Sequence, residues 1–474
     1  MKATGWDERL LVSTDGRGLV GHAGAVLLRK CADRVGLTAA LARVLPHGVG
    51  AGWRDRGTVM VGLAMAIALG ATNLSEAEQL SAHQAAVFGA PPSDSTARRT
   101  LAAIDEATLS KVAKVRARVR RHVWNLLAAR PSGFPWLTVA GKRLTGWIVI
   151  DIDATIILAH SAKIGAAVTF KKTWGFHPLA AWCANTTESL AMLLRPGNAG
   201  ANTVADHITV LRAALAQIPD ASRAKILVRI DGAGATHELL EHLEGLNTAR
   251  RTVRYTVGWK ITEADEAAIA LLPSDAWESA LDQDGEVQPE CHVAELTGLN
   301  TRVGWPEGMR LNVRRTRPAG RHKKKLTALE TKTGWRYQVT ATNIHRMWGI
   351  AGSHHPQWLD ALHRSHATVE DRVRTDKVMG LGNLPSQSWE VNRGWVLAAN
   401  LAGDLDAWTR LLGLYDDPEL AKAEPDTLRY RLWHLPARLS RHAHRRWLKI
   451  SRTWPWRTAF LTCWQHLSAL PAPT

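Results

Sequence analysis

Two apolar runs that each end in a carboxylate place the strongest constraint on the fold of this chain. The segments LTGWIVIDIDATIIL (144–158) and KILVRIDGAG (225–234) are rich in isoleucine and valine, which is typical of buried β-strands. The segments NTVADHITVLRAALAQI (202–218) and ATHELLEHLEGL (235–246) have apolar residues at helical spacing. This alternation of strands and helices predicts a mixed α/β domain.

Further strand candidates extend this domain. AVTFKKTWGFHPLAAWCAN (167–185) is predicted to form a strand, a turn and a second strand, and TVRYTVGWKIT (252–262) another strand. The resulting order is β-β-β-α-β-α-β. Residues 263–345 hold short strand candidates, separated by turn residues and the basic run RTRPAGRHKKK. They predict a small β-rich insertion.

Helical regions are expected on both sides of this domain, because Ala, Leu and Arg recur there at helical spacing. The expected fold class is an α/β core with a mixed sheet, a β-rich insertion and flanking all-helical N- and C-terminal domains. Five parts are predicted: a helical domain (1–135), two core segments (136–262 and 346–412), the insertion between them (263–345) and a helical C-terminal region (413–474).

The chain carries a formal net charge of +17, from 60 Lys and Arg residues against 43 Asp and Glu residues. A protein this basic usually meets a polyanion, and a nucleic acid is a better candidate than an anionic membrane surface. The segment from Ser93 to Arg121 holds eight basic residues, among them Arg98 and Arg99. It forms either an ordinary solvated helix face or one that contacts DNA phosphates.

Several features favour the cytoplasm. The segment MKATGWDERLL is charged and lacks the apolar core of a signal peptide. Residues 57–75 carry no charge, but their strongly apolar part (59–71) is shorter than the roughly 20 residues of a spanning helix. A buried core helix is expected there. The four cysteines are far apart and form no CxxC pair, which argues against a disulfide framework or a zinc ribbon.

Carboxylates on the two central strands are candidate site residues. Asp151 and Asp153 point to the same side of the first strand, and two buried carboxylates are costly without a cation or hydrogen bonds. Asp231 directly follows the strand KILVRI, and ligand or metal sites of α/β sheets favour this end of a strand. The alternatives are acids that cap a neighbouring element and ordinary Asp-Gly turn chemistry.

A third acid, Glu370, lies in HRSHATVEDRVRTDK (363–377). On a helix, His363, His366, Glu370 and Lys377 line one face. The glutamate can complete a metal site, while the lysine and the histidines can hold phosphate oxygens. The alternative is a solvated face with ordinary ion pairs. Zinc binding by the histidines is disfavoured, because no cysteine or third histidine lies at ligand spacing.

Together the three acids form a plausible set of metal ligands. Asp153, Asp231 and Glu370 offer the hard oxygen ligands that Mg²⁺ and Mn²⁺ prefer. Two such ions about 3.5–4 Å apart stabilise both the attacking and the leaving oxygen of a phosphodiester displacement. Since the chain is basic, DNA is the expected substrate.

These motifs resemble those of the DDE transposases of bacterial insertion sequences, in the branch with a β-strand insertion between the second Asp and the Glu. DIDAT is similar to the first-Asp strand of that family, in which the acid precedes x-Thr, and this favours Asp153 over Asp151. LVRIDGAG is similar to its second-Asp strand. FKKTWGFHPLAAW and LRPGNAGANT resemble further segments of the same branch, so the resemblance spans nearly the whole chain.

Around the glutamate the family has the pattern Tyr-x2-Arg-x3-Glu-x6-Lys. Glu370 and Lys377 match it, whereas His363 and His366 occupy the Tyr and Arg positions. This departure bears on the phosphate contacts of the two histidines and not on the metal role of Glu370. The 139 residues from Asp231 to Glu370 exceed the needs of a minimal RNase H-like core and leave room for the insertion.

The resemblance implies an RNase H-like fold and metal-dependent cut-and-paste transposition, with Mg²⁺ as cofactor and Mn²⁺ as a substitute. Transposon ends would be cleaved, through a DNA hairpin or another route, and joined to target DNA. The implied partners are double-stranded DNA, as terminal inverted repeats and target, and a second copy of the chain in a synaptic homodimer. The implied location is the bacterial cytoplasm, at the nucleoid.

The resemblance also implies further DNA contacts. An aromatic residue of the insertion, Trp305 or Trp335, would stack on a flipped base, and Lys323, Lys324 and Lys325 would contact the DNA backbone. The N-terminal helices would recognise the inverted repeats, and the C-terminal helical region would carry dimer or DNA contacts. The alternatives are tryptophans that belong to the core and a solvated lysine loop.

Other functions stay open. An RNase H-like nuclease that cuts without joining, or an inactive domesticated DNA-binding protein, would keep the same fold. A non-enzymatic regulator is disfavoured, because three carboxylates beside phosphates bring a pure DNA binder no advantage.

Overall fold

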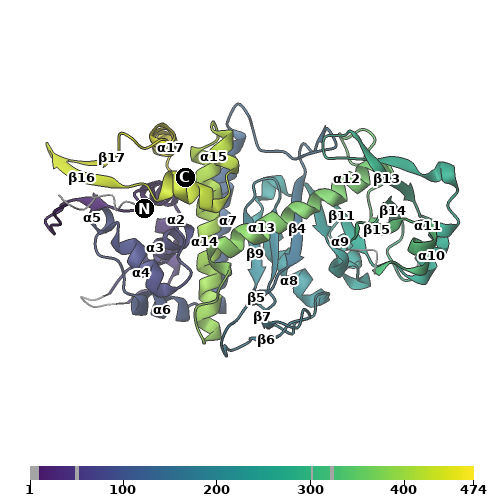
Figure 1. Ribbon diagram of the computed structural model, residues 1–474, viewed down its shortest axis with the longest axis horizontal. Helices are drawn as coiled ribbons and strands as arrows, with labels where there is room; N and C mark the ends of the chain where they lie inside the picture. Colours follow the sequence, from purple (N-terminus) through teal and green to yellow (C-terminus); the bar gives the residue numbers. More distant parts are fainter. Residues whose placement is uncertain (1–9, 49–52, 300–302, 321–324, 474) are drawn as a thin grey trace, which may run out of the picture.

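The computed structural model describes residues 10–48, 53–299, 303–320 and 325–473. Figure 1 shows an elongated molecule, with helices at one end, the central strands in the middle and a second group of strands at the other end. This mixed α/β architecture, with helices near both termini, confirms the fold class predicted from the sequence.

The central part of the sheet has five strands in the order β9-β8-β4-β10-β11. Strands β4, β8 and β9 form an antiparallel meander, and β10 and β11 are parallel to β4. This combination fits the expected RNase H-like core. The five strands are β4 (Ile148–Ala154), β8 (Leu179–Cys183), β9 (Ser189–Leu193), β10 (Lys225–Ile230) and β11 (Thr252–Trp259).

The two faces of this sheet are covered by different helices. The isoleucines of β4 belong to a core with α8 and α9, whereas Val149 packs with α12 on the opposite face. Residues two apart on a strand share a face, so Asp151 and Asp153 lie on the side of α12 and α13. Figure 1 shows α13 close to β4, with which it makes contact. The helices are α8 (Val204–Gln217), α9 (His237–Gly245), α12 (Pro356–Arg364) and α13 (Val369–Asp376).

The insertion extends the core sheet. Strand β15 pairs antiparallel with β11, and β14, β13 and β12 follow in turn, so the sheet has nine strands. The predicted β-rich character of this region is confirmed, and two helices accompany its strands. These elements are α10 (Glu263–Ala270), β12 (Glu278–Leu281), β13 (Val287–Glu295), β14 (Arg310–Thr316), α11 (Ala328–Thr333) and β15 (Arg336–Thr342).

The N-terminal helices pack around α14 (Trp389–Gly413), which also contacts β9. The uncharged run at residues 57–75 forms the buried helix α3, as expected. The described N-terminal helices are α1 (Ala25–Arg34), α2 (Leu37–Val44), α3 (Arg56–Ala68), α4 (Leu74–Ala82), α5 (Ala85–Phe88), α6 (Asp94–Ala102) and α7 (Glu106–Ala128). Helix α14 thus joins this region to the sheet.

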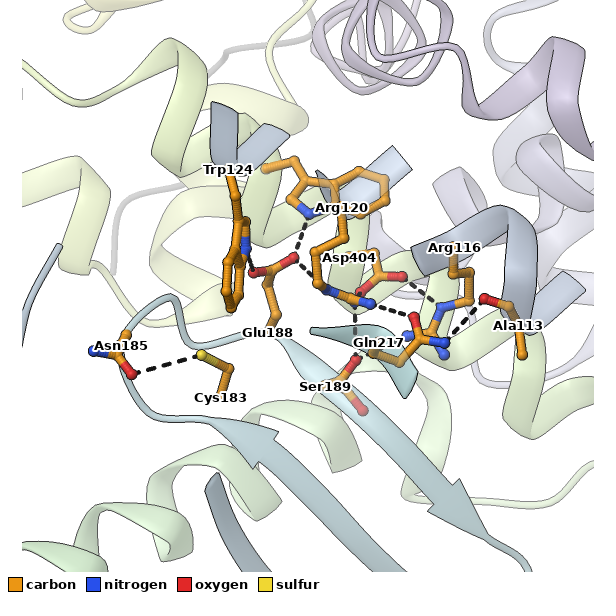
Figure 2. A network of polar contacts seen from close by, with 11 residues as sticks. Ala113, Arg116, Arg120, Trp124, Cys183, Asn185, Glu188, Ser189, Gln217 and Asp404 are labelled. Carbon is orange, nitrogen blue, oxygen red and sulfur yellow. Dashed lines mark hydrogen bonds and ion pairs between the residues drawn. The ribbon is translucent and has the colours of Figure 1, made fainter. Parts of the chain in front are cut away.

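A buried network of hydrogen bonds and ion pairs connects α7 to the core (Figure 2). Arg120 donates to Glu188 (2.8 Å) and to Asp404 of α14 (2.8 Å), and Arg116 donates to Asp404 (2.7 Å). Trp124 donates to the second Glu188 oxygen at 2.7 Å. Two guanidinium groups and two carboxylates therefore balance one another. The basic face expected on this helix is smaller than the sequence suggests, because Arg116 and Arg120 point inward.

The C-terminal region differs from the all-helical expectation. Helices α15 (Pro418–Lys422), α16 (Pro425–Leu428) and α17 (Arg457–Ala469) are present, but β16 (Ala437–His442) and β17 (Arg445–Ile450) form a hairpin between them. Leu439, Leu448 and Ile450 alternate with basic residues and pack on the core, and this period-two pattern favours strands. Strand β16 also pairs with β1 (Leu19–Val20) near the N-terminus.

Short strands complete the fold. Two of them form a small hairpin before β4, and three form a small sheet between β4 and β8. They are β2 (Thr138–Val139), β3 (Lys142–Arg143), β5 (Ile157–Leu158), β6 (Ala167–Val168) and β7 (Trp174–Phe176).

Candidate active site

Two of the predicted acids meet at the carboxyl ends of neighbouring parallel strands. Ile152 of β4 is aligned with Ile230 of β10. Asp153 and Asp231 each follow one residue later, so they lie at the same edge of the sheet. Asp153 is partly buried and Asp231 is exposed. The parallel register, a consequence of the helical crossover between the strands, brings together two residues that are 78 positions apart in the sequence.

The third acid approaches from α13. Glu370 is exposed in the first turn of this helix. Burial raises the pKa of Asp153 to about 6, and the negative charges of Asp231 and Glu370 add to this shift. Asp231 and Glu370 therefore both lie within electrostatic reach of Asp153, and their negative charges disfavour its ionised form.

The three carboxylates are chemically suitable ligands for a divalent cation, and two of them accept hydrogen bonds from backbone N–H groups. Asp153 Oδ1 accepts from the Ala154 N–H (2.7 Å), and Asp231 Oδ1 accepts from the Ala233 N–H (2.9 Å). Within the described residues, no three His, Cys, Asp or Glu side chains are positioned to hold a metal ion. Carboxylate oxygens are hard ligands, and a cation would relieve their mutual repulsion. Holding it would require the three side chains to change position.

Asp151 has a different environment. Arg229 of β10 donates to both of its carboxylate oxygens, at 2.7 and 2.8 Å, and His366 Nδ1 lies 2.8 Å from Oδ1. Burial opposes ionisation, but the nearby Arg229 and His366 hold the pKa of Asp151 below its ordinary value. Both carboxylate oxygens are therefore engaged inside the protein, which favours Asp153 as the acid of the site.

The two histidines of the predicted helix face lie against the sheet. His366 is buried beside Asp151, and His363 Nδ1 lies 3.2 Å from Thr256 Oγ1 on β11. Burial, together with the nearby His366 and Arg229, lowers the pKa of His363 to about 3, so this imidazole is neutral at pH 7. Both histidines are thus held against the sheet, and their phosphate-contact roles stay predictions.

A cavity of about 800 Å³ begins at Asp231 and extends over the insertion. Its walls come from the ends of β10 and β11, from β14 and β15, and from α12. Basic side chains border it, namely Arg314, Lys325, Arg336 and Arg364. Lys325 thus lies beside the cavity, whereas Lys323 and Lys324 fall outside the described residues. Asp360 also lines the cavity and pairs with Arg364 (2.8 Å) and Arg314 (3.7 Å), so Lys325 and Arg336 are the better candidates for contacts with an anionic ligand.

The two predicted tryptophans occupy different places. Trp305 stacks near His237 (ring centroids 3.9 Å apart) and Trp259 (4.5 Å). Trp335 packs under the guanidinium of Arg317, 3.9 Å from its ring centre. Trp259, at the end of β11, lines the cavity beside Asp231. Trp259 follows Gly258 in the strand predicted at residues 252–262, but it was not among the predicted site residues.

The remaining predicted contacts are basic residues away from the carboxylates. Lys377 follows α13, and burial together with the nearby charge of Lys171 lowers its pKa. Arg98 and Arg99 are exposed on α6. Arg229 was not among the predicted residues, although an arginine inside the apolar run KILVRI indicates a buried partner. The DNA-contact roles of Lys377, Arg98 and Arg99 stay predictions.

In the described part of the chain, no helix is both long and apolar enough to cross a membrane.

Comparisons with known proteins identify the family. The family described as transposase DDE domain group 1 matches residues 2–472. No curated protein sequence matches the chain. A solved structure with a similar chain is the cryo-EM structure of a piggyBac transposase synaptic complex with hairpin DNA, at 9% identity and a TM-score of 0.40. That match covers 89% of this chain and 83% of the other. Because the family match spans nearly the whole sequence, this chain belongs to the DDE transposases, the enzymes of DNA transposition.

Proposed function

We propose that Asp153, Asp231 and Glu370 are the three catalytic acids of this transposase. The observation that carries the proposal is their gathering at one edge of the sheet, where burial and the charges of Asp231 and Glu370 raise the pKa of Asp153. The ion pair of Asp151 with Arg229 supports the choice of Asp153 over Asp151 for this role. A carboxyl group with a perturbed pKa beside other acids is typical of functional sites.

DDE transposases generally use divalent metal ions, and Mg²⁺ is the ion proposed here, with Mn²⁺ as a substitute. The ions would be held by the oxygens of Asp153, Asp231 and Glu370. When bound, they stabilise the attacking and leaving oxygens of a phosphodiester displacement. Because ligands must be deprotonated, Asp153 must lose its proton near its pKa of about 6.

The proposed reaction proceeds in two kinds of step. In hydrolysis, a water oxygen forms a bond to the scissile phosphorus, the bond to the 3′ oxygen breaks, and that oxygen leaves as a 3′-OH. In joining, a 3′-OH attacks a phosphodiester of the target, whose own 3′ oxygen departs. The protein's role is to hold the DNA in line with the carboxylates, and its cavity supports this through the basic side chains of Lys325 and Arg336.

DNA is the proposed partner throughout. The exposed Arg98 and Arg99 on α6 suit contacts with the terminal inverted repeats, and Lys377 with Lys171 forms a basic pair near the end of α13. Pairing of two transposon ends would require a second copy of the chain, so a homodimer is proposed for the synaptic complex. The bacterial cytoplasm, at the nucleoid, is the proposed location.

Cleavage of a labelled duplex that carries the element's own end tests this function. Wild type should nick the end with Mg²⁺ or Mn²⁺ and not with EDTA, and Glu370→Gln should lose this activity. Asp371→Asn is the matched control, because Asp371 lies next to Glu370 on the same helix, is exposed and forms an ion pair with Arg374. Equal nicking by Glu370→Gln and wild type would refute the assignment.

The joining step is tested by adding target DNA to the same reaction. Covalent insertion of the cut end is expected for a transposase. Cutting without joining would instead assign the chain to RNase H-like nucleases. Tight DNA binding with neither reaction would identify an inactive, domesticated DNA-binding protein.

A further inference from the structure

The C-terminal part of the chain is entirely free of acidic residues. No Asp or Glu occurs from residue 427 to residue 474, whereas nine Lys and Arg residues do. Five of these nine lie in the hairpin formed by β16 and β17, namely Arg438, Arg441, Arg445, Arg446 and Lys449, and Arg452 lies shortly after it. Figure 1 shows this hairpin projecting at the end of the molecule farthest from the insertion.

The two faces of the hairpin differ in character. One face rests on the protein through Leu439, Leu448 and Ile450 near its base, and Arg446 at its tip donates to the carbonyl oxygens of Ala86 (3.1 Å) and Val87 (2.8 Å). The strand register places the other side chains on the opposite face, which we call the basic face. The basic face consists of Arg438, Ser440, His442, Arg445, Trp447 and Lys449.

Two cations lie directly opposite one another on the basic face. Arg438 is aligned with Lys449, and Arg445 is aligned with His442. The pair of Arg438 with Lys449 destabilises the hairpin, because the side chains of directly opposed residues are close together. In the described part of the chain, Arg438, Arg445 and Lys449 form no ion pair. Trp447 lies between the two pairs with 51% of its surface exposed. Folding alone therefore gives no reason for this arrangement.

We propose that the hairpin is an arm that binds duplex DNA through its basic face. A two-stranded ribbon fits the major groove of DNA, and its arginine and lysine side chains would neutralise phosphates. The exposed tryptophan adds a flat surface for contact with sugars or bases. This inference rests on the proposed action on DNA. It adds a binding surface that is separate from the carboxylates and their cavity.

The position of the arm defines which part of the DNA it contacts. Figure 1 shows β4 and α13, which carry Asp153 and Glu370, between the arm and the insertion strands. The arm therefore reaches duplex away from the scissile phosphate. Loss of the arm contact should weaken DNA binding without changing the rate of cutting once DNA is saturating.

The substitution Lys449→Glu tests the arm sharply, because it should affect stability and binding in opposite directions. Opposite Arg438, a glutamate converts a repulsive cross-strand pair into an attractive one, so the melting temperature should rise. DNA binding, measured by fluorescence anisotropy in EDTA over a series of salt concentrations, should weaken by about tenfold at low salt. The slope of log K against log salt should fall by about 1.

Two further variants serve as controls. Lys449→Gln removes the charge without adding a new pair, and it should lower the salt slope by a similar amount. Arg250→Glu makes the same charge change at an exposed turn before β11, at the sheet edge opposite the carboxylates, and it should leave the slope unchanged. All three variants should cut at the wild-type rate when DNA is saturating.

The outcomes separate this inference from the proposed function. If Lys449→Glu and Lys449→Gln keep the wild-type affinity, salt slope and cleavage, the proposed DNA-binding role of the arm is wrong, and the proposed catalytic function is unaffected. Failure of the wild type to bind or cut the duplex would overturn both proposals. Binding to vesicles of anionic lipid, without binding to the duplex, would assign the basic face to a membrane surface and also overturn the arm.

Discussion

Asp151 and Asp153 lie two residues apart on β4, share one face of the sheet, and have opposite surroundings. Asp151 is held by Arg229 and His366, which favour its ionised form. Asp153 is surrounded by the charges of Asp231 and Glu370, which disfavour it. The difference arises because Arg229 is aligned with Asp151 across the strands, whereas Asp231 continues beside Asp153. One carboxylate therefore stabilises the fold, and the other is available for chemistry.

Asparagine substitutions should separate these two roles. Asp151→Asn leaves Arg229 buried without its carboxylate and should lower the free energy of unfolding by about 3–5 kcal/mol. Asp153→Asn removes a charge that its neighbours repel, so stability should stay equal or rise while cleavage is lost. Urea denaturation of both variants, with a cleavage assay, measures this. A large loss of stability in Asp153→Asn would contradict the assignment.

Asp376, near the end of the helix that carries Glu370, gives a pH-dependent prediction. Burial raises its pKa to about 7, although Trp182 donates to its carboxylate at 2.8 Å. A folded pKa above the unfolded value stabilises the protein at low pH, and this stability is lost as pH rises from about 4 to about 7.

The Asp376→Asn variant should not lose stability as the pH rises. Its amide oxygen can still accept the hydrogen bond from the Trp182 N–H. Relative to wild type, the variant should gain about 1–3 kcal/mol between pH 4 and pH 8. Urea denaturation across this range measures the difference, and the exposed Asp371→Asn serves as its control. A difference that does not vary with pH would show that Asp376 is ionised throughout.

At the scale of elements, the acids could be located from the sequence because their signals are local. The apolar runs that became β4 and β10 and the helical spacing around Glu370 were sufficient to propose them, and the family resemblance decided between Asp151 and Asp153. The partners of Asp151 depend on strand register, which a single sequence does not specify. The hairpin of β16 and β17 was not predicted. Its strands contain only a few apolar residues at alternate positions, and their many basic residues also suit a helix.

The contact between β11 and the turn after β10 yields an element-scale prediction. A Cβ added at Gly258 would lie 2.8 Å from the Gly232 nitrogen and 3.1 Å from the Asp231 carbonyl carbon. Gly258→Ala should therefore displace Asp231 and slow single-turnover cleavage by tenfold or more, since small misplacements in a site have large effects on rate. Gly245→Ala, at the end of α9 with open space around it, should cut normally. Equal rates for both variants would contradict a role for Asp231.

At the scale of the whole molecule, separate parts of the sequence are joined by continuous structure. The insertion continues the core sheet through β11 and β15, and α14 lies between the N-terminal helices and β9. The five predicted parts follow the order of elements along the chain. Their mutual packing could not be derived from sequence, because it depends on long-range pairs such as Arg120 with Glu188 and Asp404.

The buried network should make the N-terminal helices and the core unfold together. Glu188→Gln leaves its donors Arg120, Trp124 and Trp408 around a neutral group, so stability should fall by about 3–5 kcal/mol. Denaturant unfolding followed by tryptophan fluorescence and by circular dichroism should shift as one transition. Glu238→Gln, an exposed change on α9, should have little effect. Two separate transitions, of which Glu188→Gln shifts only one, would contradict this coupling.

The metal-ligand role of Asp153 is tested most directly by exchanging its carboxylate for a thiol and comparing two metals in single-turnover cleavage of the labelled end. A thiolate is a softer ligand than a carboxylate and is poorly suited to Mg²⁺. Asp153→Cys should be inactive with Mg²⁺ and regain part of its activity with Mn²⁺, whereas wild type should cut with both. Wild-type cleavage by Asp153→Cys in Mg²⁺, or a metal switch that appears in Asp151→Cys instead, would contradict the assignment of the site.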